Sequence, residues 1–388
     1  MNTKPISFAF LPYALLFMAL SAFAVVQPNY SWDLVGYIGS SVNSSNPERV
    51  YQETFEAIRT IKENKYLQLE NPYRADVAAN PYHFGQQLPL YSIKPVYVAL
   101  IEGLHRSGVP YPKSAVAISA ASNFILALLL WFWMSSYLDG WSRLAACTLI
   151  MLSPNLLELS RWATPDALST LLAAVGLYLI LGRKRYFWGC AVLVLGVWVR
   201  TDAVVLAGIV MMFLFLGRKI DFLQFASLSI LALGSYFVID HYSGNYGWSV
   251  LFYNSFSGGV VAPGETAVHV SFAAYLRQLV KGSYLALTEG SIAVYALLTG
   301  LAVWLKKSSP YSQMAAVVLG SRLVSYALYP NGDQRYTAVL YVMIPVALVL
   351  AVSSEITDRL GQRTPVAANA SSATMNAPIF DSESLSHR

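Results

Sequence analysis

Charged residues are scarce in this sequence: Asp, Glu, Lys and Arg make up only 12% of its 388 residues. Hydrophobic residues make up 56%, more than is usual in a water-soluble domain. Apolar runs long enough to cross a hydrocarbon core of roughly 30 Å recur from residue 8 to residue 353. This composition excludes an ordinary soluble fold and predicts an all-α, integral, multi-pass membrane protein.

Cysteine and the common nucleotide motifs are also nearly absent. The two cysteines, Cys147 and Cys190, both fall inside predicted spans, which argues against a disulfide framework or a cysteine metal site. There is no Walker loop, GxSxG elbow, HExxH motif or dinucleotide fingerprint, so a nucleotide-sugar donor is disfavoured. No repeat of fixed period divides the chain into similar halves, as it would in many transporters.

Basic residues lie in short clusters between the apolar runs. The four clusters are Arg183 to Arg185, Arg218-Lys219, Lys306-Lys307 and Arg359 with Arg363. Such clusters mark cytoplasmic loops, so we interpret the net charge of +5 as membrane anchoring and expect no nucleic-acid partner. Placing all four inside predicts about ten transmembrane helices. These are residues 8–26, 114–137, 144–159, 165–181, 186–199, 203–217, 222–240, 285–305, 311–329 and 336–353.

This threading predicts the domain organisation. Residues 1–353 form a transmembrane catalytic domain with two large outer segments, residues 27–113 and 241–284. Residues 354–388, rich in Ala, Ser and Asn, are expected to be a disordered cytoplasmic tail.

Three stretches need separate interpretation. Residues 88–104 would invert every later span if they crossed the membrane, so we predict a juxtamembrane or half-inserted helix interrupted at Lys94-Pro95. Residues 48–66 have the pattern of an amphipathic surface helix. The first apolar run ends in Ala22-Phe23-Ala24, a possible signal-peptidase site, but we favour an uncleaved span.

Charged residues gather at the predicted outer boundary. They are Asp33, Lys94, Asp166, Arg200, Asp202, Arg277, Lys281, Asp333 and Arg335, with Arg161 close to Asp166. Each acid–base pair could simply cap helices and neutralise its own charge. The number of such residues on one face favours a functional site.

The residue types in this group suit transfer from a lipid phosphate. Asp33, in SWDLVGY, is a candidate general base, although it could also be an interfacial cap. The cations could balance a lipid-linked phosphate, whereas Arg277 and Lys281 could equally anchor a surface helix at the headgroups. His83 could bind substrate, but no second histidine stands at ligand spacing, so we predict no metal site there.

Two motifs in the first half resemble the GT-C superfamily of membrane glycosyltransferases, in particular the branch of protein O-mannosyltransferases and lipid A aminoarabinose transferases. Asp33 and Tyr37 match the acidic residue and tyrosine after the first span, although the common Asp-Glu pair is replaced by Asp33-Leu34. YSIKPVYVAL resembles the family's Lys-Pro-Pro-Leu stretch, with Lys94-Pro95 kept and Val96 in place of the second proline.

Three later motifs extend the resemblance. LSPNLLELSRWATPDALSTLL is similar to an outward span followed by a turn with an aspartate, here Asp166 next to Arg161. WVRTDAVVL places Arg200 at the outer end of a later span. GDQRYTAVLYVMIPVAL resembles a C-terminal Arg-Tyr, here Arg335-Tyr336.

The resemblance implies an inverting glycosyltransferase with a polyprenyl-phosphate-sugar donor and a lipid, glycan or protein acceptor, at the outer face of a bacterial inner membrane. Asp33 would be the catalytic base, the cations would hold the phosphate, and Asp166 and Tyr37 would orient sugar or acceptor. A divalent cation is possible but not required. A non-catalytic polyprenyl-lipid flippase and a solute transporter remain alternatives; the first would not need Asp33, and the second would place charges along a path through the membrane.

Overall fold

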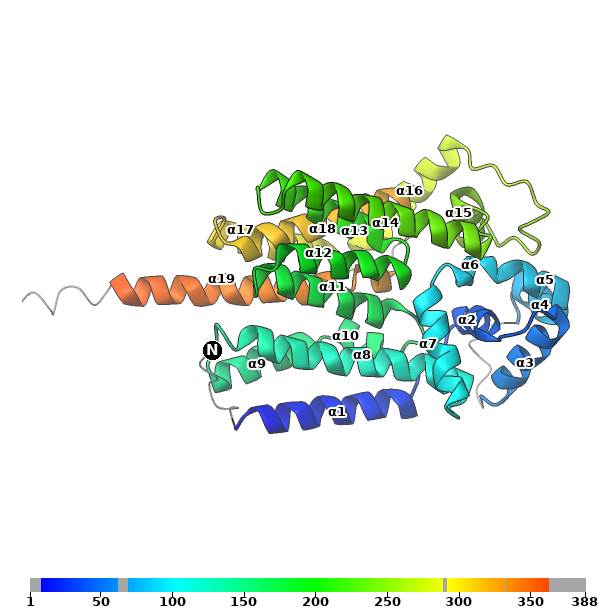
Figure 1. The fold of residues 1–388 in the computed structure, drawn as a ribbon, viewed down its shortest axis with the longest axis horizontal. Coiled ribbons are helices and arrows are strands. Elements are labelled where there is room, and N and C mark those ends of the chain that lie inside the picture. The colour runs from blue at the N-terminus through cyan, green and yellow to red at the C-terminus, as the bar shows by residue number, and fades with distance from the viewer. Residues whose placement is uncertain (1–7, 62–68, 289–291, 332, 363–388) are drawn as a thin grey trace, which may run out of the picture.

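The computed structural model describes residues 8–61, 69–288, 292–331 and 333–362, and within these ranges the chain is helical with no strand. Figure 1 shows long helices side by side along the longest axis and short helices gathered at one end. The long-helix body comprises α1 (Phe10–Val26), α8 (Tyr111–Met134), α9 (Gly140–Met151), α10 (Pro154–Arg161), α11 (Asp166–Leu181), α12 (Tyr186–Leu195), α13 (Ala203–Leu216), α14 (Phe222–Ser243), α17 (Ile292–Leu305), α18 (Pro310–Leu328) and α19 (Leu340–Gln362).

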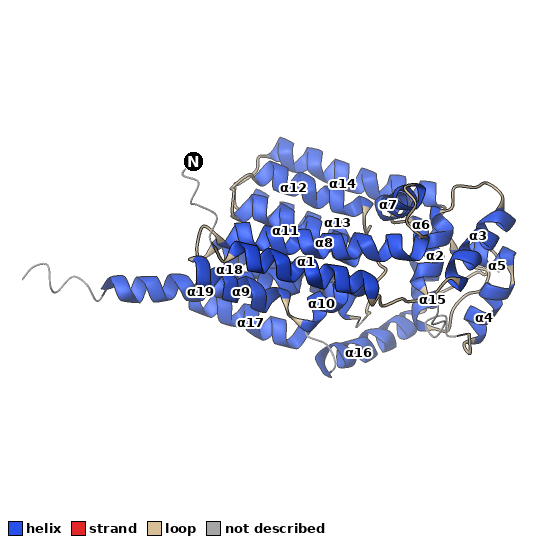
Figure 2. Ribbon diagram, turned by 90° about the horizontal axis from the view of Figure 1, so that it is seen from below, coloured by secondary structure: helices blue, strands red, loops and turns tan. Residues whose placement is uncertain are grey.

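The short helices form a cap over one end of this body, as Figure 2 shows from a second direction. The cap consists of α2 (Asp33–Ser41), α3 (Pro47–Arg59), α4 (Pro72–Ala79), α5 (Pro81–Gln87), α6 (Pro89–Ser92), α7 (Pro95–Arg106) and α15 (Trp248–Phe256). The amphipathic α16 (Phe272–Thr288) lies beside it. Two short 3-10 turns, η2 (Gly196–Trp198) and η3 (Gln334–Thr337), lie close to the cap.

Proline and asparagine define where the cap helices begin. Five consecutive cap helices, α3 to α7, start with proline, whose missing N–H costs nothing at a first helical position. Asn46, Asn71 and Asn80 precede three of them, and each side chain accepts a hydrogen bond from a backbone N–H of the first turn, at 3.0, 3.0 and 2.9 Å. The interruption expected at Lys94-Pro95 is the boundary between α6 and α7.

The helices of the body pack closely through small residues. A Cβ atom on Gly189 would lie 2.7 Å from the backbone oxygen of Gly176, so α11 and α12 meet at a contact that only glycine permits. The hydroxyl of Tyr13 donates a 2.9 Å hydrogen bond to the backbone oxygen of Ala127 and joins α1 to α8. Such packing matters in a membrane because lipid tails are as apolar as the helices.

The structure supports membrane-spanning helices but not the number of them that the sequence predicts. Among the described helices, α8 and α14 are long and apolar enough to cross a membrane. The pair α16 and α17, at 68° to each other, passes the same test if the two helices count as one span. Five apolar segments of 10–17 residues also occur, namely α1, α11, α12 with η2, α13 and the first part of α19. The all-helical prediction is confirmed for these residues, whereas the count of about ten spans remains a prediction.

Several predicted boundaries differ from the structure. Residues 144–159 are two helices, α9 and α10, because Pro154 cannot continue the first and begins the second. The span predicted at 285–305 includes the end of α16 and all of α17, and residues 289–291 of it lie outside the described part. Helix α19 extends to Gln362, so the first part of the predicted disordered tail is helical, and residues 363–388 lie outside the described part.

Candidate functional site

A cavity of about 830 Å³ lies where the cap meets the body. Its wall is built from segments far apart in the sequence: α2, α6, the start of α11, the turn before α13, α15 and the last turns of α18. The cap and the body therefore both contribute to one site, which we call the main cavity.

The main cavity has an excess of positive charge. Its charged lining residues are the cations Arg74, Lys94, Arg200, Arg322 and Arg335 and the acids Asp33, Asp166 and Asp202. Five cations against three acids leave a formal charge of +2. A partly enclosed cavity of this charge favours an anionic ligand, because the low local dielectric strengthens the attraction.

Arg200 holds two carboxylates together. Its guanidinium binds both oxygens of Asp202, at 3.0 and 2.9 Å, and its Nη1 binds Asp166. Asp166 also accepts a 2.6 Å hydrogen bond from the hydroxyl of Thr164. Both acids lie at helix N-termini, Asp166 at α11 and Asp202 at α13, where the helix dipole favours negative charge.

This arrangement determines the charge of Asp202. Burial alone would raise the pKa of its carboxyl group, but the positive charge of Arg200 and the hydrogen bonds that it donates outweigh burial and lower the pKa to about 2. Asp202 is therefore ionised at neutral pH. Since Arg200 already carries two acid partners, we assign this group to holding α11 and α13 in place rather than to binding a free anion.

Arg335 forms a second clamp, between the cap and the body. Its Nη1 lies 3.2 Å from the carboxylate of Asp33, the first residue of α2, and its Nε lies 2.8 Å from Asp333. The guanidinium carbon is 5.1 Å from the centre of the Trp162 ring. Asp33 remains one-third exposed, so a ligand in the main cavity can reach its carboxylate.

Lys94 lines the main cavity and has no ion-pair partner within the described ranges. Its ammonium lies 5.2 Å from the Tyr37 ring and 5.7 Å from the Tyr91 ring, and donates a weak 3.4 Å bond to the backbone oxygen of Leu90. Burial, reinforced by the charge of Arg200, lowers the pKa of Lys94 to about 8. The buried Tyr37 stays neutral, because burial raises the pKa of its hydroxyl.

Arg322 is a cavity residue that the sequence reasoning missed. It lies within α18, and its Nε is buried without a hydrogen-bond acceptor among the described residues. The hydropathy of residues 311–329 predicts an apolar span, in which one charged residue has little weight. The signal was nonetheless present, since an arginine inside such a span is costly and usually functional.

Some predicted site residues lie elsewhere. His83, in α5, pairs with Asp76 at 3.2 Å, and Arg161 donates a 2.7 Å hydrogen bond to the backbone oxygen of Gln27. Arg277 and Lys281 are exposed on α16, and none of these four lines the main cavity. The side chain of Tyr336 lies outside the described part of the structure.

The sequence leaves a divalent cation open, and the described residues give it no ligand set. Within the described ranges, no group of three or more His, Cys, Asp or Glu side chains is placed to hold a metal ion. Asp33 faces Arg335 rather than a second carboxylate.

Comparison with protein-family models, characterised proteins and solved structures finds no match to this chain.

Proposed function

We propose that this protein transfers a sugar from a polyprenyl-phosphate donor to an acceptor at the membrane surface. The observation that carries the proposal is the placement of Asp33 in a cavity with a formal charge of +2. A polyprenyl phosphodiester has one negative charge and an apolar tail. Such a donor matches a cationic cavity at the end of an apolar helical body.

The chemistry follows from the charges. Asp33 accepts the proton of the acceptor hydroxyl while the hydroxyl oxygen attacks the anomeric carbon. The bond from that carbon to the phosphate oxygen breaks, and its electron pair leaves with the lipid phosphate. Lys94 and Arg322, neither of which forms an ion pair with an acid among the described side chains, stabilise the charge that develops there. Attack opposite the leaving group inverts the anomeric configuration.

Arg335 gives Asp33 a defined position for this step. A carboxylate at the end of a short helix could adopt several rotamers, but its contact with Arg335 fixes it in the cavity wall. The same arginine is fixed by Asp333 and by the Trp162 ring. We therefore regard Arg335 as a positioning residue for Asp33.

The same proposal includes the type of enzyme and its orientation in the membrane. We infer a GT-C-like enzyme that crosses a bacterial inner membrane about ten times, with the main cavity facing the periplasm. Support comes from the basic clusters, which place residues 183–185 and 306–307 on the opposite side from Asp33. In Figure 1 the cap and the basic turn between α11 and α12 lie towards opposite ends of the body.

The test is transfer in proteoliposomes containing radiolabelled polyprenyl-phosphate hexoses or pentoses, offered one at a time with a bacterial membrane-lipid and glycan extract as acceptor. We expect the wild type to yield labelled product and free polyprenyl phosphate. Asp33→Asn should lower the rate by roughly 10²- to 10⁴-fold. Asp76→Asn, the same change outside the cavity, should act like the wild type. No transfer from any donor, or an unchanged rate in Asp33→Asn, would overturn the proposal.

A non-catalytic flippase is the alternative, since the same cations would hold a lipid phosphate. Movement of a fluorescent polyprenyl phosphate between leaflets distinguishes the two. Under the proposed function, Asp33→Asn abolishes transfer. A flippase would move lipid equally in wild type and variant and would form no glycosylated product.

A further inference from the structure

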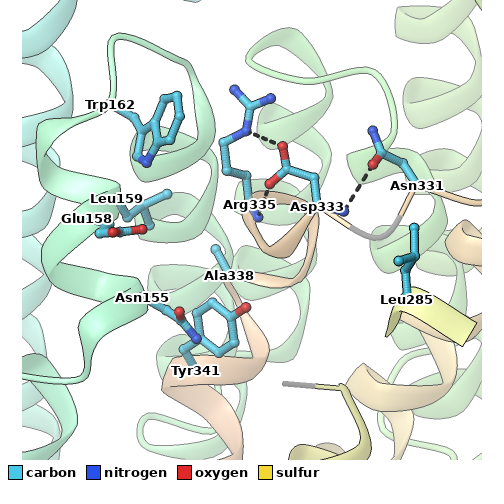
Figure 3. A pocket seen from close by; sticks show the side chains of 10 residues that line it. All are labelled: Asn155, Glu158, Leu159, Trp162, Leu285, Asn331, Asp333, Arg335, Ala338 and Tyr341. Atoms are coloured by element: carbon cyan, nitrogen blue, oxygen red, sulfur yellow. Dashed lines mark hydrogen bonds and ion pairs between the residues drawn. The ribbon is translucent and has the colours of Figure 1, made fainter. Parts of the chain in front are cut away.

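A second cavity, of about 440 Å³, adjoins the main cavity; we call it the side cavity. Figure 3 shows side chains of α10 on one side and those of the segment after α18 on the other. Arg335 and Asn331 line both cavities. The two spaces are therefore neighbours separated by the Arg335 clamp.

The side cavity has a different charge from the main cavity. Its charged lining residues are Glu158, Asp333 and Arg335, which give a formal charge of −1. The guanidinium of Arg335 is already bound to Asp333 at 2.8 Å and to Asp33 at 3.2 Å. Glu158 is exposed to the cavity and has no ion-pair partner among the described side chains. An anionic ligand is therefore disfavoured here.

The remaining lining residues suit a hydroxyl-rich ligand. Asn155 offers both an amide donor and a carbonyl acceptor, and the carboxylate of Glu158 can accept from hydroxyl groups. Trp162 adds a partly exposed aromatic surface, which can pack against the C–H groups of a sugar ring. A few convergent polar groups beside an aromatic ring are typical of small-ligand sites.

We propose that the side cavity binds the acceptor, and that the acceptor is a sugar chain without acidic groups. This inference rests on the proposed function, because it assigns the donor phosphate to the main cavity and the acceptor to its neighbour. The acceptor hydroxyl then approaches Asp33 past Arg335 and Asn331. Charge separates the two substrates: the +2 cavity holds the anionic donor, and the −1 cavity rejects it.

The test measures binding separately from activity. The full-length protein in detergent is dialysed against radiolabelled maltotriose as the neutral probe, glucosamine trimer as the cationic probe and galacturonic acid trimer as the acidic probe. We expect maltotriose and the glucosamine trimer to bind, and the galacturonic acid trimer to bind more weakly than either. Asn155→Ala and Trp162→Ala should each weaken maltotriose binding roughly three- to tenfold, whereas Arg322→Gln should not change it. Asn155→Ala is the safer variant, since the Trp162 ring also packs against Arg335.

A parallel arm uses geranyl methyl phosphate, a singly charged phosphodiester, as the probe of the main cavity. Arg322→Gln should weaken its binding, and Asn155→Ala should not. Failure of maltotriose to bind, preference for the acidic trimer, or equal binding by wild type and both side-cavity variants would overturn the acceptor assignment. Failure of the phosphodiester to bind would instead contradict the proposed function.

Discussion

The body and the capped end of this protein hold together by different means. In the body, helices meet through glycine and apolar contacts, as α11 and α12 do at Gly176 and Gly189. At the capped end, two arginine clamps join distant segments around a cavity. Shape complementarity leaves no space between helices, whereas charge clamps can hold segments together while the space between them stays open. The comparison predicts that the two regions respond differently to substitution.

The largest expected effect on stability is at the Arg200 clamp. Arg200→Gln leaves the buried carboxylate of Asp166, which is 3% exposed, without its charged partner. Breaking a buried ion pair costs about 3–5 kcal/mol in the free energy of unfolding. Chemical denaturation in detergent micelles measures it. Adding Asp166→Asn should restore part of the loss, and a loss of similar size in Arg277→Gln would show that the clamp is not special.

The next effect separates the cavity cations from those on the surface. Arg322→Gln should weaken the binding of geranyl methyl phosphate by roughly 10- to 100-fold, since a charge-assisted hydrogen bond contributes about 1.5–3 kcal/mol. Arg277→Gln makes the same chemical change on the exposed face of α16 and should leave binding unchanged. Isothermal titration calorimetry provides the measurement. Equal losses in both variants would favour headgroup attraction over a defined phosphate site.

A substitution in the packed body should change stability less than the Arg200 substitution, and a second glycine provides a matched control. Gly189→Ala would place a methyl group 2.7 Å from the backbone oxygen of Gly176, which cannot move without shifting α11. We expect a loss of about 1–3 kcal/mol in the free energy of unfolding. Gly208→Ala, in α13, meets no atom within 4 Å and should be neutral or slightly stabilising. If both variants have the same melting temperature, the close approach of α11 and α12 is not a source of stability.

The sequence predicted the helical class and the gathering of charge better than it predicted the individual contacts. Hydropathy located most of the apolar helices. Placing the basic clusters in cytoplasmic loops put Asp33, Lys94, Arg200 and Arg335 on one face of the membrane, and all four line the main cavity. Hydropathy does not locate the break before α10, although Pro154 is a signal for it in the sequence. The 68° angle between α16 and α17 depends on backbone geometry, which hydropathy does not report.

The individual contacts of the site could not be predicted from the sequence, because they depend on how distant segments pack together. Asp33 and Arg335 meet although 302 positions separate them, whereas Arg335 and Asp333 are sequence neighbours that any pairing rule would find. Arg322 was hidden because an apolar window averages a single charge away. Arg277 and Lys281 carried the right charge, but α16 leaves both exposed outside the main cavity.

The smallest expected effect depends on pH and concerns Lys94. Because burial lowers the pKa of its ammonium group to about 8, Lys94 is mainly charged at pH 7 and loses its proton as the pH rises through that value. Affinity for geranyl methyl phosphate, whose own charge is constant over this range, should therefore fall roughly tenfold between about pH 7 and pH 9.5. Lys94→Arg keeps its charge and should give a flat profile, so a fall of equal size in this variant would assign the titration to another group. A flat wild-type profile would mean that the phosphate is held by the arginines alone, which would place the donor nearer to Arg322 and farther from the Tyr37 and Tyr91 rings that surround Lys94.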